Sequence, residues 1–157
     1  MFSFFKKKKA PETKLYSPTA GTLIPLAQVD DPVFSQGMMG PGLAVEPAIA
    51  EIYSPVNGKI TTVFPTKHAI GVEADNGKAI LLHIGIDTVE LNGEGFDVFV
   101  KEGDTVTPET LLARVDHAFL KAQGKPSTLM VLFPEEKELP AVSEKPIAEH
   151  DEIFNLD

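Results

Sequence analysis

Short runs of apolar and β-branched residues, separated by turn signals, recur along most of this sequence. Such runs lie at residues 22–24, 42–45, 59–64, 69–73, 79–82, 96–100, 111–115 and 129–133. Many of the 12 Gly and 13 Pro residues stand between them. Many short strands with frequent turns are typical of β-sandwiches and β-barrels. We therefore expect an all-β fold, an antiparallel β-sandwich or barrel-sandwich hybrid with short helical turns.

One turn-and-strand motif occurs twice. Residues 16–23, Tyr-Ser-Pro-Thr-Ala-Gly-Thr-Leu, return as residues 53–60, Tyr-Ser-Pro-Val-Asn-Gly-Lys-Ile. Two copies indicate pseudo-symmetric halves of one sandwich rather than a repeat array. A helix is expected only after Asp116, which can cap a short segment that runs through Lys121 and stops before Gly124.

Length and composition predict one globular domain. The chain has 157 residues, of which 43% are hydrophobic and 24% charged, enough to bury a substantial core. It has no cysteine, which excludes disulfides, thiolate zinc sites and cysteine nucleophiles and fits a cytoplasmic protein. No apolar stretch approaches the ~20 residues that span a bilayer, and the apolar start before the charges is not typical of a secretory signal.

Charge divides the chain into a basic start and an acidic body. Residues 1–14 hold five Lys and one Glu, so residues 15–157 carry −13 within the overall −9. An acidic body argues against a nucleic-acid partner and for partners that present Arg and Lys. We expect a flexible basic N-terminal tail at 1–14, one domain at 15–145 and an acidic C-terminal tail at 146–157, which could be docked on the domain or disordered.

The N-terminal tail has two interpretations. Its three Phe beside four consecutive Lys could give weak membrane association, with the Lys side chains pairing with anionic lipid. It could equally be a disordered, solubilising arm. The expected location is cytoplasmic, with a peripheral position at the inner face of the membrane under the first interpretation.

Two histidines flank a predicted hairpin. The segment Ala74-Asp75-Asn76-Gly77 contains an Asn-Gly pair that marks a tight turn. His68 and His83 lie at nearly equal distances from this turn, so antiparallel pairing would bring them together. His117 and His150 have no such setting, and we expect both to be solvated surface residues.

Several segments resemble one protein family. They are residues 57–60, 66–69 and 83–96, with residues 31–34 as a supporting match. Together they closely resemble the glucose-family enzyme IIA of the bacterial phosphoenolpyruvate-dependent sugar phosphotransferase system. The similarity covers roughly residues 15–133, and the block that begins at His83 is its most specific part.

The resemblance implies a histidine phosphocarrier, a phosphotransferase component that needs no cofactor. Phospho-HPr would donate a phosphoryl group to Nε2 of His83, which would pass it to the IIB domain of a sugar permease. Nδ1 of His83 would donate to the backbone carbonyl of Gly85, which fixes the tautomer. His68 would stabilise the phosphoryl group, and Thr66 would orient His68. Relatives also control permeases and kinases through their phosphorylation state.

The same resemblance implies a docking face for both partners. Its candidate apolar members are Val33, Phe34, Met38, Met39, Phe64, Ile70, Leu81 and Val89. Beyond them, Asp31, Asp87 and Glu73 would pair with Arg or Lys of the donor and acceptor. Phe64, Ile70 and Leu81 could instead be core residues, and Asp87 could cap its own turn.

Two other classes remain open from the residues alone. His68, His83 and Asp87 offer three ligands for a zinc-dependent hydrolase. The turns also occur in biotinyl and lipoyl carrier domains, although the hairpin tip Asn76-Gly77-Lys78 lacks the flanking residues typical of the modified lysine. Independently of both classes, His68 and His83 could bind zinc opportunistically, bridging to a partner that supplies a carboxylate.

Overall fold

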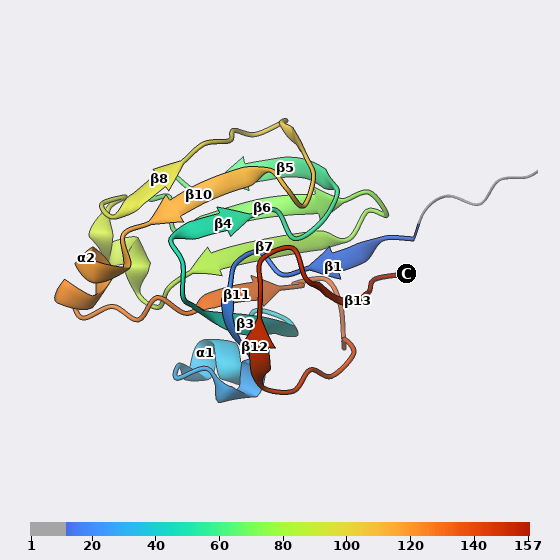
Figure 1. The fold of residues 1–157 in the computed structure, drawn as a ribbon, viewed down its shortest axis with the longest axis horizontal. Coiled ribbons are helices and arrows are strands. Elements are labelled where there is room, and N and C mark those ends of the chain that lie inside the picture. Colours follow the sequence, from blue (N-terminus) through green and yellow to red (C-terminus); the bar gives the residue numbers. More distant parts are fainter. Residues whose placement is uncertain (1–11) are drawn as a thin grey trace, which may run out of the picture.

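The computed structural model describes residues 12–157 and is built almost entirely from antiparallel strands (Figure 1). An eight-stranded sheet has the order β12 (Lys145–Ile147), β2 (Gly21–Pro25), β3 (Gly42–Pro47), β11 (Leu129–Leu132), β7 (Ala79–Ile84), β6 (Ala69–Ala74), β5 (Gly58–Val63) and β9 (Thr105–Val106). A three-stranded sheet has the order β4 (Glu51–Tyr53), β10 (Leu111–Val115) and β8 (Phe96–Val98). The strands β1 (Lys14–Tyr16) and β13 (Glu152–Asn155) form a separate pair. The expected all-β fold is confirmed.

Within the part of the chain that the structure describes, helical structure is limited to short segments. They are α1 (Pro32–Ser35), α2 (His117–Ala122) and two 3-10 turns, η1 (Leu26–Gln28) and η2 (Thr88–Leu91). The predicted cap of α2 is confirmed, because the Asp116 side chain accepts a hydrogen bond from the Phe119 N–H at 3.0 Å. Within residues 12–157, no helix is long and apolar enough to cross a membrane.

Two apolar clusters lie on opposite faces of the large sheet. The larger cluster joins this sheet to the three-stranded sheet and contains Leu43, Ile60, Leu82, Leu112 and Val131 among others. The smaller cluster lies under α1 and η1 and contains Ile24, Leu26, Phe34, Met130 and Leu132. Successive strand residues point to opposite faces, so β7 directs Ile80, Leu82 and Ile84 into the larger cluster and leaves Leu81 and His83 on the α1 side.

The predicted hairpin between the histidines is confirmed. Strands β6 and β7 pair antiparallel with Ala69 opposite His83 and Glu73 opposite Ala79. The Gly77 N–H donates to the Ala74 carbonyl at 2.8 Å, and Gly77 has a φ of 89°. Only the glycine of the Asn-Gly pair is left-handed, which is typical of a three-residue loop that ends in a glycine bulge.

The repeated motif forms a reciprocal contact between two halves of the sandwich. In both copies the serine hydroxyl donates to a carbonyl two residues ahead, Ser17 to Thr19 and Ser54 to Val56. Each copy also bonds to the other. The Tyr16 N–H donates to the Pro55 carbonyl at 2.8 Å, and the Tyr53 N–H donates to the Pro18 carbonyl at 2.7 Å. The copies are therefore related by approximate twofold symmetry, as the repeat predicts.

The expected boundaries of the two tails need correction. Residues 146–157 are not a separate acidic tail, because β12 pairs with β2 and β13 pairs with β1. Two apolar side chains, Ile147 and Leu156, anchor this segment in the larger core cluster, while acidic residues such as Asp151 and Glu152 stay exposed. At the other end Lys14 already belongs to β1. The three Phe and four Lys residues of the expected basic tail lie outside the described residues.

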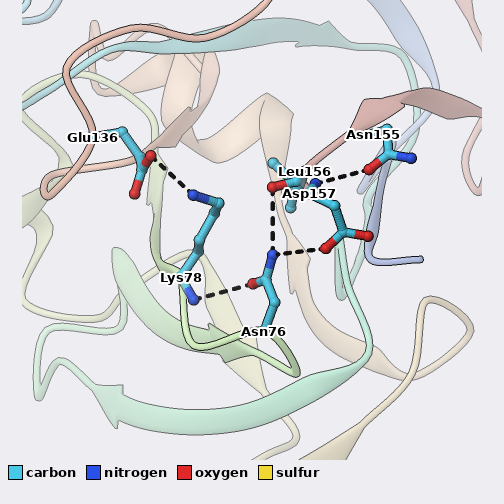
Figure 2. Close-up of polar contacts among 6 residues, drawn as sticks. All are labelled: Asn76, Lys78, Glu136, Asn155, Leu156 and Asp157. Atoms are coloured by element: carbon cyan, nitrogen blue, oxygen red, sulfur yellow. Dashed lines mark hydrogen bonds and ion pairs between the residues drawn. The ribbon is translucent and has the colours of Figure 1, made fainter. Parts of the chain in front are cut away.

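The last residues also reach the tip of the β6–β7 hairpin. Figure 2 shows the Asn76 side-chain amide directed at the Leu156 carbonyl and at an Asp157 carboxylate oxygen, both at 3.4 Å. Beside it, the Lys78 ammonium donates to Glu136 at 3.0 Å. The hairpin tip is therefore fastened at the end of the strands opposite the histidines.

Candidate active site

The two histidine rings lie face to edge on the α1 side of the sheet. His83 is in β7, and His68 directly precedes β6. Because Ala69 pairs with His83, the rings come within 5.1 Å of each other, centroid to centroid, with 80° between their planes. The Ile84 N–H donates to the His68 carbonyl at 2.7 Å and holds the two segments together. The predicted juxtaposition of the histidines is confirmed.

The hydrogen bond of His83 determines its tautomer. Its Nδ1 lies 2.9 Å from the Gly85 carbonyl oxygen. A carbonyl only accepts, so Nδ1 carries the proton and Nε2 keeps its lone pair when the ring is neutral. Among residues 12–157, no group bonds to Nε2 of either histidine. His83 is thus arranged as a nucleophile at Nε2.

The loop after β7 gives the Gly85 carbonyl its direction. Gly85 has a φ of 82°, and a Cβ there would lie 2.5 Å from Cγ2 of Thr88 and 2.8 Å from the Pro126 carbonyl oxygen. Both the left-handed backbone and the close packing therefore require glycine. Thr88 is fully buried, and its hydroxyl donates to the Ile84 carbonyl at 2.5 Å. Thr88 was not among the residues expected at the site; a threonine in the loop directly after the histidine strand was its only signal in the sequence.

His68 is held by a hydroxyl and packed by an aromatic ring. Its Nδ1 lies 2.7 Å from the Thr66 hydroxyl oxygen. The ring is only 6% exposed and meets Phe64 edge to face at a centroid distance of 5.5 Å. Since the hydroxyl can donate or accept, this contact fixes the direction of the ring but leaves its tautomer open.

Burial keeps both histidines neutral near pH 7. The pKa of His83 falls from 6.5 to about 4, chiefly because the ring is desolvated and also because His68 lies beside it. The Gly85 carbonyl, Asp31 and Asp87 partly oppose this decrease. Burial also lowers the pKa of His68. A neutral imidazole with a free Nε2 is the form that can accept an electrophile.

Four predicted docking residues are exposed apolar side chains, carried by the α1 segment, by Phe64 beside His68 and by the 3-10 turn after Gly85. Among the predicted docking residues, Val33 is 42% exposed, Met38 71%, Phe64 37% and Val89 49%. Large apolar side chains with this exposure on one functional region suit protein contact. Asp31 caps α1, because its side chain accepts a hydrogen bond from the Val33 N–H at 2.9 Å. Asp87 is exposed and has a left-handed backbone.

Other predicted docking residues are placed differently. Ile70 lies opposite Leu82 and, like it, faces the larger core cluster, where it is fully buried, so it cannot contact a partner. Phe34 is also buried, and its ring packs on His83 at a centroid distance of 4.8 Å. Met39 and Leu81 are half-buried against the smaller cluster. Glu73 is exposed on β6 opposite Ala79, near the hairpin tip rather than beside the histidines.

The two remaining histidines do not join this site. His150 is exposed, as expected, and its Nδ1 lies 2.9 Å from the Pro108 carbonyl. His117 was expected at the surface and is instead half-buried at the start of α2. Its Nε2 lies 2.8 Å from the Ile49 carbonyl, and its Nδ1 is buried without a hydrogen-bond partner among the described residues.

The residues that a zinc hydrolase or a biotinyl or lipoyl carrier would use are not arranged for either function. Within residues 12–157, no three His, Asp or Glu side chains are grouped to hold a metal ion, so His68, His83 and Asp87 do not form the site of a zinc hydrolase. The lysine of the hairpin tip, which a biotinyl or lipoyl carrier would modify, is Lys78. Its ammonium is paired with Glu136.

Comparison with known proteins agrees with this geometry. The model of the family described as phosphoenolpyruvate-dependent sugar phosphotransferase system, EIIA 1, matches residues 13–139. The glucose-specific EIIA component of Oceanobacillus iheyensis is 46% identical over 128 residues, which cover 82% of this chain and 78% of that protein. The glucose-specific EIICBA component of Staphylococcus saprophyticus is 47% identical over 126 residues, or 80% of this chain and 18% of that longer protein.

A solved structure has the same fold over the full length. The glucose permease IIA of Mycoplasma capricolum superposes with a TM-score of 0.82 at 35% identity, with all of both chains covered. The family match, the relatives and the shared fold agree with the histidine pair. The chain belongs to the EIIA 1 family of the phosphoenolpyruvate-dependent sugar phosphotransferase system.

Proposed function

We propose that Nε2 of His83 is the atom that carries the phosphoryl group in this phosphotransferase component. The observation that carries the proposal is the Nδ1 hydrogen bond to Gly85, which leaves the Nε2 lone pair free on a ring that burial keeps neutral. Nε2 attacks the phosphorus of phospho-HPr, and the bond from phosphorus to HPr breaks as the new N–P bond forms. The IIB domain of a permease then takes the group by the same exchange.

His68 stabilises the transferred group in this proposal. A phosphoryl group on Nε2 of His83 carries ~2 negative charges. These charges would lie next to the His68 ring, whose centroid is 5.1 Å from that of His83. Such charge favours a donating or protonated His68, and Thr66 holds that ring in place through Nδ1. Positioned donors of this kind supply much of the catalysis of phosphoryl transfer.

HPr and the IIB domain would dock on the exposed apolar residues that flank the histidines. Val33, Met38, Phe64 and Val89 provide the apolar area, and Asp31 and Asp87 provide carboxylates for Arg or Lys of each partner. The Staphylococcus saprophyticus relative is named as a single EIICBA component, which supports a IIB domain as the acceptor. The relatives named above are glucose-specific, and we propose glucose as the sugar.

We also propose where the protein acts, what it regulates and which metal it can bind. The phosphocarrier would act in the cytoplasm without a required cofactor, with the basic start of the chain giving weak contact with the membrane. Its phosphorylation state would regulate permeases or kinases. Zinc could bridge His68 and His83 to a carboxylate of a partner, since two neutral imidazoles within reach of each other suit this metal.

The test is phosphorylation by phosphoenolpyruvate with enzyme I and HPr, followed by intact-mass measurement. We expect one acid-labile phosphoryl adduct on the wild type and none on His83→Ala. His68→Gln should accept the group but pass it slowly to a IIB domain. His150→Gln, a change at an exposed histidine outside the site, is the matched control and should behave as wild type. A folded wild type without any adduct would refute the proposal.

A further inference from the structure

Two peptide groups set the direction of the Gly85 carbonyl, and each is fixed at both ends. In the group that joins residues 84 and 85, the Ile84 carbonyl accepts from the Thr88 hydroxyl and the Gly85 N–H donates to the Thr128 carbonyl at 2.8 Å. In the next group, the Gly85 carbonyl accepts from His83 Nδ1 and the Ile86 N–H donates to the Pro126 carbonyl at 3.1 Å.

Of these four hydrogen bonds, the one from Thr88 differs in the kind of group that makes it. Two of the partners are backbone carbonyls, and the third is the imidazole of His83 itself. Among the residues that the structure describes, Thr88 is therefore the one side chain outside the reacting histidine that holds this turn. Its methyl group also packs on the turn, because a Cβ at Gly85 would lie 2.5 Å from Thr88 Cγ2.

The same contact reaches the second histidine. Ile84 donates its N–H to the His68 carbonyl and accepts the Thr88 hydroxyl at its own carbonyl. Ile84 therefore connects the Thr88 hydroxyl, through its carbonyl in the 84–85 peptide group, with the segment that carries His68, through its N–H in the 83–84 peptide group. Thr88 lies at the start of η2 and is fully buried, so solvent cannot replace its hydroxyl without opening the turn.

We infer that Thr88 is a positioning residue for phosphoryl transfer: by bonding Ile84 and packing on Gly85, it holds the Gly85 carbonyl against Nδ1 of His83 and so keeps the lone pair at Nε2. The inference rests on the proposed function for its effect on transfer. Its effect on the tautomer of His83 does not, because the tautomer exists in the unphosphorylated protein.

Thr88→Val is the direct test, since valine keeps the shape and the methyl group and removes only the hydroxyl. The Ile84 carbonyl then loses its donor, and the turn can relax away from His83. We expect ¹⁵N spectra of the histidine-labelled protein at pH 7.5 to show a mixture of His83 tautomers in place of one form protonated at Nδ1. The rate of phosphorylation by phospho-HPr should fall about tenfold, the lower end of the cost of mutating a group that orients a metal-ligating histidine.

Thr19→Val is a matched control. Thr19 is another fully buried threonine whose hydroxyl donates to a backbone carbonyl, that of Glu51 at 2.8 Å, but it lies in the repeated turn away from the histidines. Thr19→Val should lower stability by a similar amount and leave the tautomer and the rate unchanged. Thr88→Ser, which keeps the hydroxyl, should restore the tautomer of the wild type and most of its rate.

The outcomes separate the two proposals. Unchanged tautomer and rate in a folded Thr88→Val would overturn the role of Thr88, as would equal losses in Thr19→Val. A wild type that is not phosphorylated would refute the proposed function, while the spectra would still decide the role of Thr88. If Thr88→Val does not fold, Thr88→Ser and Thr88→Ala replace it, because both lack the methyl group and only serine keeps the hydroxyl.

Discussion

At the residue scale, the environment of His83 opposes its protonation. Desolvation and the neighbouring His68 lower its pKa to about 4. We expect a ¹⁵N NMR titration to show His83 neutral throughout the range from pH 8 to 5.5, with its midpoint near 4. In His68→Gln the pKa of His83 should rise, because the repulsion between two imidazolium rings is removed while burial remains. A midpoint near 6.5 in the wild type would contradict this account of the site.

The same lowered pKa couples the stability of the protein to pH. The unfolded chain takes up a proton at His83 near pH 6.5, whereas the folded protein does so only near pH 4. Between these values the unfolded state binds more protons, so the free energy of unfolding falls as the pH decreases. The contribution is on the order of 3 kcal/mol over the whole window. Urea unfolding at pH 7 and pH 5 measures the part of this contribution that falls between the two pH values, about 2 kcal/mol. His83→Gln should lose less stability than the wild type between these pH values.

Single residues also show where sequence reasoning succeeds and where it stops. The histidine pair follows from its spacing about one turn, because antiparallel pairing is fixed once the turn is known. Ile70 and Phe34 could not be assigned in this way. An apolar residue beside a histidine looks the same in the sequence whether the sheet face is open or covered. Only the packing of the other layer buries Ile70 and sets Phe34 against His83.

At the scale of elements, two glycines let strands of the two half-motifs approach their neighbours. A Cβ at Gly58 would lie 2.0 Å from the Glu73 carbonyl oxygen, and one at Gly21 would lie 2.0 Å from that of Glu46. Each glycine starts the strand that follows a Ser-Pro turn, and each pairs with the last residue of the neighbouring strand, Gly21 with Pro47 and Gly58 with Ala74. The two copies of the repeat therefore make equivalent close contacts, each at its own glycine.

Gly58→Ala tests this close approach. The added methyl group meets a backbone oxygen that cannot move without separating β5 from β6, so we expect a loss of about 2–3 kcal/mol in the free energy of unfolding. Gly77→Ala is the comparison, because no atom lies within 4 Å of its Cβ position and only the left-handed backbone is strained; its cost should be about 1 kcal/mol. Equal costs for the two changes, measured by urea unfolding, would mean that close approach is not the reason for glycine at 58.

The sequence predicts some strands and helices correctly and misses others. Regular alternation and turn residues indicated most strands of the large sheet, and Asp116 indicated the helix α2. The segments β12 and β13 were missed because they are short and surrounded by acidic residues, so local composition resembles that of a tail. Their pairing with β2 and β1 depends on strands more than 120 residues earlier in the chain, which local sequence patterns cannot reveal.

At the scale of the whole molecule, the fold separates the chemistry from the closure of the sandwich. His68 and His83 lie at one end of the β6–β7 hairpin, on the side covered by α1. The pair of β1 and β13 and the contacts of Asn76 lie at the other end. A rigid sheet between them suits the proposed transfer, in which one nitrogen is presented to two successive partners, since the site is formed before either partner binds.

This separation predicts that closure can be weakened without affecting transfer. Leu156 is 5% exposed and joins the larger core cluster beyond β13. Leu156→Ala should therefore cost about 2–4 kcal/mol of unfolding free energy, because it removes the anchor that holds the last strand on β1. The rate of phosphorylation of the folded variant at 25 °C should match that of the wild type.

Asn155→Ala provides the control from the adjacent, exposed position, where, among residues 12–157, the side chain bonds to Glu12 and to the Asp157 N–H alone. Surface changes of this kind cost within about 0.5 kcal/mol. If Leu156→Ala were equally mild, residues 146–157 would behave in solution as the tail that their composition suggests. If it instead slowed phosphorylation in the folded state, closure and the histidine site would be coupled through the hairpin whose tip the last residues contact, and the sheet would not isolate one end from the other.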